Sequence, residues 1–219
     1  MIMAQNFERS PVQGNKRTMK YYPWTDDEAD DSLAWIDKDP DEIRKKMYRL
    51  HKGISGKDWF PENIEFELSP DDGIKLADAI PNTALIWIIS EKLRTILEEK
   101  SGAEFEFFPV KIRDRKGHLV KKDYFVANLL ETNECVDMEK SDFIMNRIIK
   151  TQVNYFKTLV LDDKKVNPES KIFRLKEQTK LIIVREDLKN EILNAGCTGI
   201  VFRDIDDFGS EFRTQPGTR

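Results

Sequence analysis

The side chains best suited to catalysis are few in this 219-residue chain. Its only histidines are His51 and His118, and its only cysteines are Cys135 and Cys197. His51 comes at the end of a predicted helix and His118 beside a predicted hairpin turn, so we expect both to be solvated loop residues. The chain has no His-x-x-x-His or Cys-x-x-Cys spacing, which disfavours a standard zinc site. The sequence therefore predicts neither a metal site nor histidine-based catalysis.

Nucleophilic and phosphate-binding motifs are missing from the sequence as well. Cys197 follows Gly196 near a predicted helix C-terminus, where the helix dipole opposes thiolate formation. We therefore interpret both cysteines as small buried thiols, and two cysteines fit a reducing compartment. There is no glycine-rich phosphate loop and no Gly-x-Ser-x-Gly elbow, and the clustered acids lack the spacing of a calcium loop. We predict that the protein is not an enzyme and has no cofactor.

An acidic segment with several aromatic residues is the most unusual feature. Trp24–Ile43 contains nine Asp or Glu residues and one base, Lys38, so it carries a charge of about −8. It has two interpretations: an ordinary acidic surface whose tryptophans lie in the core, or a docking surface with aromatic anchors and steering carboxylates. The candidate partner-binding residues are Trp24, Asp26, Asp27, Glu28, Asp30, Asp31 and Trp35.

Composition limits the class of protein. The 13 Phe and 4 Trp residues can supply a core, which argues against wholesale disorder. With 36 basic and 40 acidic residues the net charge is −4, which argues against a general nucleic-acid binder. Lys140–Lys189 has a surplus of five basic residues, but they alternate with apolar residues as on a solvated sheet face. The chain shows no signal peptide and no apolar run of about 18 residues, so we expect a soluble, cytoplasmic protein without a membrane partner.

The first clear structural unit is a strand, a helix and a strand. The apolar run Ala84–Ile89 predicts a buried strand, and Ser90 occupies the position of a helix N-cap. Apolar residues at helical spacing follow, and Gly102 is placed as the helix stop. Phe105 begins another extended segment. We also expect strands over Ile64–Leu68 and Leu119–Leu130, and a helix over Ile43–Leu50.

A similar unit occurs near the end of the sequence. Leu181–Val184 predicts a strand, residues 185–193 a helix, and Gly199–Phe202 a return strand. The shared pattern agrees equally with a remote duplication and with convergence of two ordinary units. Between the units, Ile144–Leu161 and Lys171–Leu175 favour strands, although Phe143–Ile149 also suits a helix.

These elements predict an α+β protein: a mixed β-sheet with packed helices, two strand–helix–strand units and an acidic N-terminal extension. We expect a flexible lead-in over residues 1–19, a single domain over residues 20–208 and a flexible tail over residues 209–219.

The order of short motifs resembles a known family over about residues 20–205. The motifs are Lys20-Tyr21-Tyr22, Leu50-His51-Lys52-Gly53, Trp59-Phe60-Pro61, Ile89-Ser90-Glu91-Lys92-Leu93, Glu106-Phe107-Phe108-Pro109-Val110, Tyr124-Phe125-Val126-Ala127-Asn128-Leu129, Val136-Asp137-Met138-Glu139-Lys140-Ser141, Lys171-Ile172-Phe173-Arg174-Leu175 and Gly199-Ile200-Val201-Phe202. Together they resemble immunity-protein family eleven of bacterial polymorphic toxin systems.

The resemblance implies a cytoplasmic, non-catalytic antidote that binds and neutralises one cognate toxin domain by stoichiometric occlusion, the toxin being delivered by contact-dependent or type VI secretion. Two alternatives stay open: an effector adaptor or chaperone, and an enzyme that reverses a toxin's modification. The oligomeric state is undetermined. The family's motif residues, for which the resemblance implies structural roles, are Pro109, Asn128, Asp137, Ser141, Gly199 and Phe202.

Overall fold

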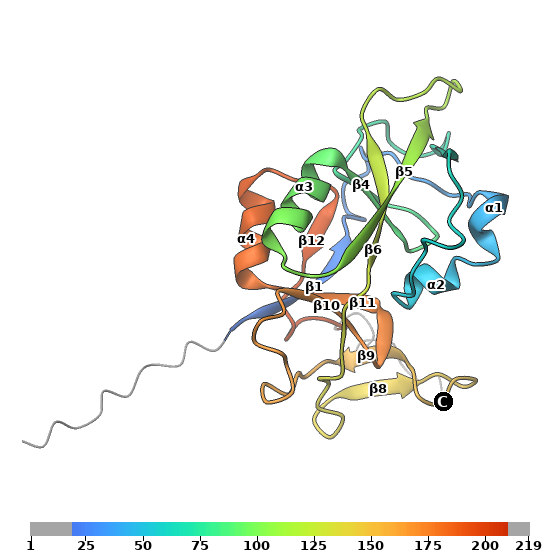
Figure 1. The fold of residues 1–219 in the computed structure, drawn as a ribbon. Helices are drawn as coiled ribbons and strands as arrows, with labels where there is room; N and C mark the ends of the chain where they lie inside the picture. Colours follow the sequence, from blue (N-terminus) through green and yellow to red (C-terminus); the bar gives the residue numbers. More distant parts are fainter. Residues whose placement is uncertain (1–18, 210–219) are drawn as a thin grey trace, which may run out of the picture.

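Two five-stranded sheets and a separate hairpin make up the computed structural model, which describes residues 19–209 (Figure 1). The elements are β1 (Tyr21–Asp26), α1 (Asp41–Arg44), α2 (Tyr48–His51), β2 (Ile64–Glu67), β3 (Ala79–Ile80), β4 (Trp87–Ser90), α3 (Glu91–Lys100), β5 (Phe105–Arg113), β6 (Tyr124–Leu129), β7 (Thr132–Asn133), β8 (Asp142–Met145), β9 (Val153–Thr158), β10 (Ile172–Leu175), β11 (Gln178–Arg185), α4 (Glu186–Asn194) and β12 (Ile200–Phe202).

The two predicted strand–helix–strand units are confirmed, and each belongs to a different sheet. In the sheet ordered β2-β5-β6-β4-β3, helix α3 connects β4 to β5, and β6 lies between them and antiparallel to both. In the sheet ordered β12-β1-β11-β10-β7, helix α4 connects β11 to β12, and β1 lies between them in the same way. The mixed pairing confirms the α+β class, and both units insert one antiparallel strand between the strands that the helix joins.

Helices α3 and α4 lie side by side (Figure 1) and share one apolar cluster with both sheets. Leu93 and Leu97 of α3 and Leu188 and Ile192 of α4 are buried in that cluster. The spacing of four residues places each pair on one helix face, which is why two short charged helices can be held by their packing. The core between the two sheets is thus built from the two units together.

The start of α3 is closed by the predicted cap. The Ser90 hydroxyl accepts a hydrogen bond from the Leu93 backbone N–H at 3.3 Å and donates one to Asp78 at 2.7 Å. We expect Ser90→Ala to lower the free energy of unfolding by about 1 kcal/mol, because an N–H of the first turn loses its acceptor. Urea unfolding measures this, with Thr95→Ala, farther along α3, as the comparison; equal losses in the two variants would contradict a capping role.

The acidic segment is anchored in the core by a few apolar residues and does not form a separate extension. Its first residues form β1, which pairs with both β11 and β12, and Leu33, Ala34 and Ile36 are buried beneath the other sheet. Apolar side chains recur among the acids, and two flanking strands satisfy the backbone of β1. The expectation of an acidic extension therefore gives way to an integrated central strand followed by an acidic surface loop.

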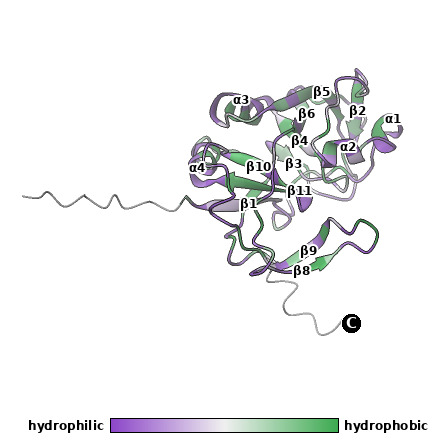
Figure 2. Ribbon diagram, turned by 60° about the horizontal axis from the view of Figure 1, so that its bottom comes forward, coloured by the Kyte–Doolittle hydropathy of each residue, from purple (hydrophilic) through white to green (hydrophobic). Residues whose placement is uncertain are grey.

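One predicted helix differs in the structure, and the segment that left strand and helix open forms the strand. The segment 43–50 is divided between α1 and α2, each only four residues long. The segment 143–149 forms strand β8 and a turn, and β8 pairs with β9. Its β-branched isoleucines favour the strand. Figures 1 and 2 both show the β8–β9 hairpin projecting beyond the sheet that contains β1 and β11.

Asp78 connects the two units. Its carboxylate, 4 % exposed, forms ion pairs of 3.0 Å with Lys92 on α3 and with Lys122 before β6. It also accepts hydrogen bonds from Ser90 and from the backbone and hydroxyl of Thr198 in the loop after α4. These hydrogen bonds and ion pairs hold the pKa of Asp78 at about 2 against the opposing effect of burial. One carboxylate thus joins segments from both strand–helix–strand units.

Gly199 allows the same two segments to approach. Its φ is +82°, and a Cβ built there would lie 2.1 Å from the Ala79 carbonyl oxygen. Only glycine tolerates both the positive φ and that contact. The family resemblance implies a structural role for Gly199, and this close approach to Ala79 explains that role.

The predicted lead-in (residues 1–19) and tail (residues 209–219) lie outside the described residues, except for Met19 and Gly209. None of the helices between residues 19 and 209 combines the length and the hydrophobicity needed to cross a membrane.

Candidate functional site

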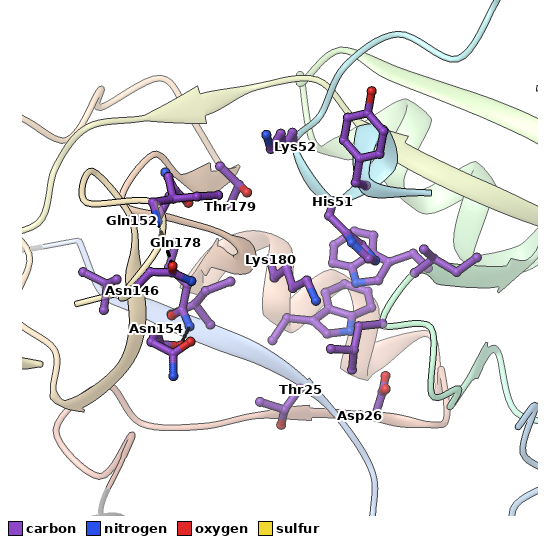
Figure 3. Close-up of a pocket in the computed structure, with 18 of the residues that line it drawn as sticks. Thr25, Asp26, His51, Lys52, Asn146, Gln152, Asn154, Gln178, Thr179 and Lys180 are labelled. Atoms are coloured by element: carbon purple, nitrogen blue, oxygen red, sulfur yellow. Dashed lines mark hydrogen bonds between the residues drawn. The ribbon is translucent and has the colours of Figure 1, made fainter. Parts of the chain in front are cut away.

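A cleft opens where β1 and β11 stop pairing. Their register ends at Trp24 and Ile182, although β1 continues to Asp26 and β11 begins at Gln178. The pairing of β10 with β11 also shifts at this point, so that residues 179–181 have no partner in the register. The resulting cleft has a volume of about 740 Å³ and is lined by β1, α2, the loop before β4, the β8–β9 turn and the start of β11 (Figure 3).

Aromatic rings form part of the cleft lining. Trp24 and Trp87 stack with ring centroids 4.2 Å apart, and Phe202 meets Trp24 edge-on at 5.4 Å. Trp24 is 5 % exposed, and its indole Nε1–H is buried without a hydrogen-bond partner among the described residues. Buried polar groups are nearly always paired, so this donor marks the cleft as incomplete.

Apolar side chains also stand exposed on the cleft wall. Tyr48 and Leu85 are more than half exposed and Ile149 nearly so, and all three line the cleft. Ile148, next to Ile149 in the β8–β9 turn, is 91 % exposed. Isolated exposed apolar residues are common, but a group around one cleft is typical of an interaction site.

Leu85 is held in an unfavourable backbone conformation. Its φ is +55°, a region that a leucine rarely adopts. The buried side chain of Asn82 fixes the loop by donating to the carbonyls of Ile80 and Ile86 and by accepting from the Ile86 N–H. The protein therefore stores strain in order to present a leucine to solvent, a pattern that is concentrated at functional sites.

Asp26 provides an unpaired carboxylate in the cleft. Its side chain is half-buried, and burial raises its pKa to about 7, with a smaller contribution from the negative charge of Glu28. If the β1–β11 ladder continued, Asp26 would lie opposite Lys180. No ion pair joins Asp26 to Lys180 or to any other described residue.

Apart from Asp26 and Glu28, the charged side chains that line the cleft are basic. His51, Lys52 and Lys180 are part of this lining (Figure 3). The prediction that His51 is a solvated loop residue is wrong, because it ends α2, is half-buried and lies 2.7 Å through Nε2 from the Ala84 carbonyl. Burial lowers its pKa, and the charges of Lys180 and Arg174 add to that effect. The imidazole thus fastens α2 to the loop that carries Leu85.

A second hollow of about 420 Å³ lies beside the cleft and shares Glu28 with it. Its acidic lining also includes Asp30 and Asp31, together with Asp71 and Asp72 from the turn that follows β2. The acidic hollow, as we call it, therefore gathers five carboxylates from two segments of the chain. Lys75 offsets part of this charge through a 3.1 Å ion pair with Asp30.

The sequence-predicted residues are divided between these two features. Trp24, Asp26 and Glu28 line the cleft, whereas Glu28, Asp30, Asp31 and Trp35 line the acidic hollow. Asp27 lines neither. Sequence reasoning missed Tyr48, Leu85, Ile149 and Lys180. One signal was available in the sequence: the pair Ile148-Ile149 lies between the basic residues Arg147 and Lys150. Two adjacent isoleucines flanked by charged residues in a turn cannot both be buried in a hydrophobic core.

The two cysteine thiols, the candidate nucleophiles, are buried. Cys135 and Cys197 are free and buried, as predicted, and burial raises the pKa of these thiols to about 12 and about 11 respectively. His118 is solvated as expected, with its side chain 74 % exposed. In residues 19–209 no group of three or more His, Cys, Asp or Glu side chains is arranged to hold a metal ion.

Further motif residues have visible structural contacts. Asn128 donates to Glu106 and to the Ile54 carbonyl, each at 3.0 Å. Asp137 accepts from the backbone of Glu139 and Lys140, and Ser141 bonds to both backbone groups of Val160. These contacts close turns and brace strands, and none of these residues lines the cleft.

Comparison with known proteins identifies the family. No match to a curated protein was found. The model of a family described as Immunity protein family (Imm11) matches residues 7–207, nearly the whole chain. The chain therefore belongs to the Imm11 immunity protein family.

Proposed function

We propose that this immunity protein neutralises one cognate toxin domain by covering it stoichiometrically in the cytoplasm, and that the toxin arrives by contact-dependent or type VI secretion. Family membership supports a toxin-neutralising role. The proposal adds the mechanism, in which binding alone inhibits the toxin. Such a mechanism needs fast association and high affinity, and it needs no reactive group on the inhibitor.

The acidic hollow beside the cleft is the observation that carries the proposal. Five carboxylates converge there, opposed by Lys75 and by the Arg115 guanidinium, which donates to the Pro70 and Asp72 carbonyls. A field of this kind raises the association rate of a basic partner by roughly 10–1,000-fold. Enzymes that act on polyanions have basic clefts, so a toxin of this class would find here a mimic of its substrate. The predicted site residues Trp24, Asp26, Asp27, Glu28, Asp30, Asp31 and Trp35 are proposed to form or support this surface.

Neutralising the carboxylates tests the surface. We expect the combined variant Asp26→Asn, Asp27→Asn, Asp30→Asn and Asp31→Asn to bind the toxin domain at least tenfold more weakly, and with a flatter salt dependence, because steering charge is lost. Calorimetric titration at two ionic strengths measures both effects. The control changes the same number of exposed acids elsewhere: Asp37→Asn, Glu42→Gln, Glu99→Gln and Glu139→Gln. Equal behaviour of the two variants would contradict the proposal.

Stoichiometry separates this mechanism from its two alternatives. In co-expression, an occluding inhibitor rescues growth only near one copy per toxin. An enzyme that reverses a modification would rescue at far lower ratios, and an adaptor or chaperone would bind the effector without abolishing its toxicity. Titrating the expression of the immunity protein against a fixed toxin level distinguishes the three.

A further inference from the structure

We propose that the cleft receives an extended segment of the toxin, which places a lysine or arginine side chain against Asp26 and apolar side chains along the wall that carries Tyr48, Leu85 and Ile149. This inference rests on the proposed function and names the part of the toxin that the antidote recognises.

The first argument is that the half-buried carboxylate of Asp26 has no partner within the described chain. The buried carboxylates of Asp78 and Glu106, by contrast, are both satisfied: Asp78 by two lysines, and Glu106 by Ser55, Gly56 and Asn128. Asp26 is desolvated in the cleft and has no such contact among the described residues. Removing a carboxylate from water costs free energy, and an ion pair with a cation offsets that cost. A basic side chain from outside is the complement that the site lacks.

The second argument is that Lys180, the nearest candidate partner in the strand register, forms no ion pair with Asp26. Lys180 lies at the position that the β1–β11 register would place opposite Asp26, yet the two strands cease to pair before reaching it. In Figure 3, Lys180 lies between Asp26 and the polar wall formed by Asn146, Gln152 and Gln178. An internal ion pair would have closed the cleft, so the separation of the strands keeps the carboxylate available.

The third argument concerns the rest of the cleft. Leu85 is strained into exposure, and Tyr48 and Ile149 are exposed on the same cleft wall. Apolar side chains beside the cation of an extended segment would cover Leu85 and Ile149. The volume of about 740 Å³ is of a size that holds a ligand.

Continuity with the acidic hollow favours a macromolecular occupant over a small molecule. Glu28 borders both features, so a basic protein drawn to the hollow arrives beside Asp26. The long-range charges and the local anchor would then act on one partner in sequence: the hollow affects association and the cleft affects dissociation.

A double-mutant cycle tests the inference. The probe is the purified cognate toxin domain, in its active form for inhibition and in an inactivated form for binding, together with inactivated variants in which each lysine or arginine is replaced in turn by methionine. We expect Asp26→Asn to weaken binding at least tenfold, and the loss to be non-additive with that of one particular toxin cation. Ile149→Ser should weaken binding severalfold. Asp37→Asn, an exposed aspartate outside the cleft, changes the same charge and should alter affinity by less than threefold.

The outcomes separate the two proposals. If wild-type protein does not bind or inhibit the toxin domain, the proposed function is overturned. If it binds and inhibits but Asp26→Asn matches Asp37→Asn, or no toxin cation couples to Asp26, the inference about the cleft is overturned while the inhibitor function stands. Competition by a small cationic molecule, without coupling to any toxin residue, would likewise reject a protein segment as the occupant.

Discussion

Asp78→Ala is expected to lower the free energy of unfolding by about 3 kcal/mol, a large share of the stability of an ordinary domain. The substitution removes two 3.0 Å ion pairs and the acceptor for Ser90 and Thr198 in a site that is 4 % exposed. Lys92 and Lys122 are about 40 % exposed and can regain water, which keeps the loss near the lower end of the range for broken buried pairs. Urea unfolding at pH 7 measures the change.

Acid titration adds an independent test of the same site. The pKa of Asp78 is about 2 in the folded protein against an ordinary value of 3.8. A depressed pKa gives stability that is present above pH 4 and is lost as the pH falls toward 2. Asp78→Asn should therefore be less stable at pH 7 and should lose less stability between pH 4 and pH 2 than wild type. The control Asp123→Ala, an exposed neighbour of Lys122, should change stability by less than about 0.5 kcal/mol. Parallel acid curves for wild type and Asp78→Asn would show that the ion pairs contribute nothing.

Local patterns in the sequence were enough to predict the two units. An apolar run, Ser90 as a cap, helical spacing and a glycine stop are all short-range signals, and the structure has an element at each. The role of β1 was not predictable in the same way. Its six residues contain no Val, Ile or Leu and include Pro23, which disfavours an interior strand. They form one because β11 and β12, more than 150 residues away in the sequence, pair with them. Pairing between strands so far apart in the sequence leaves no local sequence pattern from which it could be predicted.

The candidate site was only partly predictable for a related reason. The acids and tryptophans were visible as composition, but composition does not distinguish Trp24, which lies in the core, from Trp35, which lines the acidic hollow. The cleft exists because a ladder ends two residues early, and no residue type signals that. Arg174 shows the same limit: it was counted among surface bases, yet it is buried and donates to the carbonyls of Leu129 and Thr179.

Asp26→Asn is expected to stabilise the free protein while it weakens toxin binding. The pKa of Asp26 is about 7 in the folded protein and 3.8 when unperturbed. A raised carboxyl pKa means that ionisation opposes folding, so wild type loses stability as the pH rises from about 4 to about 7. The full shift corresponds to roughly 4 kcal/mol. Because the side chain is only half-buried, we expect the variant to exceed wild type by about 2 kcal/mol at pH 8 and to equal it near pH 4.

The affinity for the toxin domain should follow the opposite course. A toxin cation binds the ionised carboxylate, so wild-type affinity should rise about tenfold between pH 6 and pH 8, and that of Asp26→Asn should stay flat. The neighbouring charged groups are Glu28 on β1's side and Lys180, Lys52 and His51 across the cleft. Of these, His51 has a pKa lowered by burial, and a His51→Gln variant that keeps the wild-type pH dependence would assign that dependence to Asp26. Greater stability combined with weaker binding is the mark of a residue kept for function at the expense of folding. An Asp26→Asn variant that is less stable at pH 8, or one whose affinity keeps the wild-type pH dependence, would show that Asp26 already has its partner within the chain.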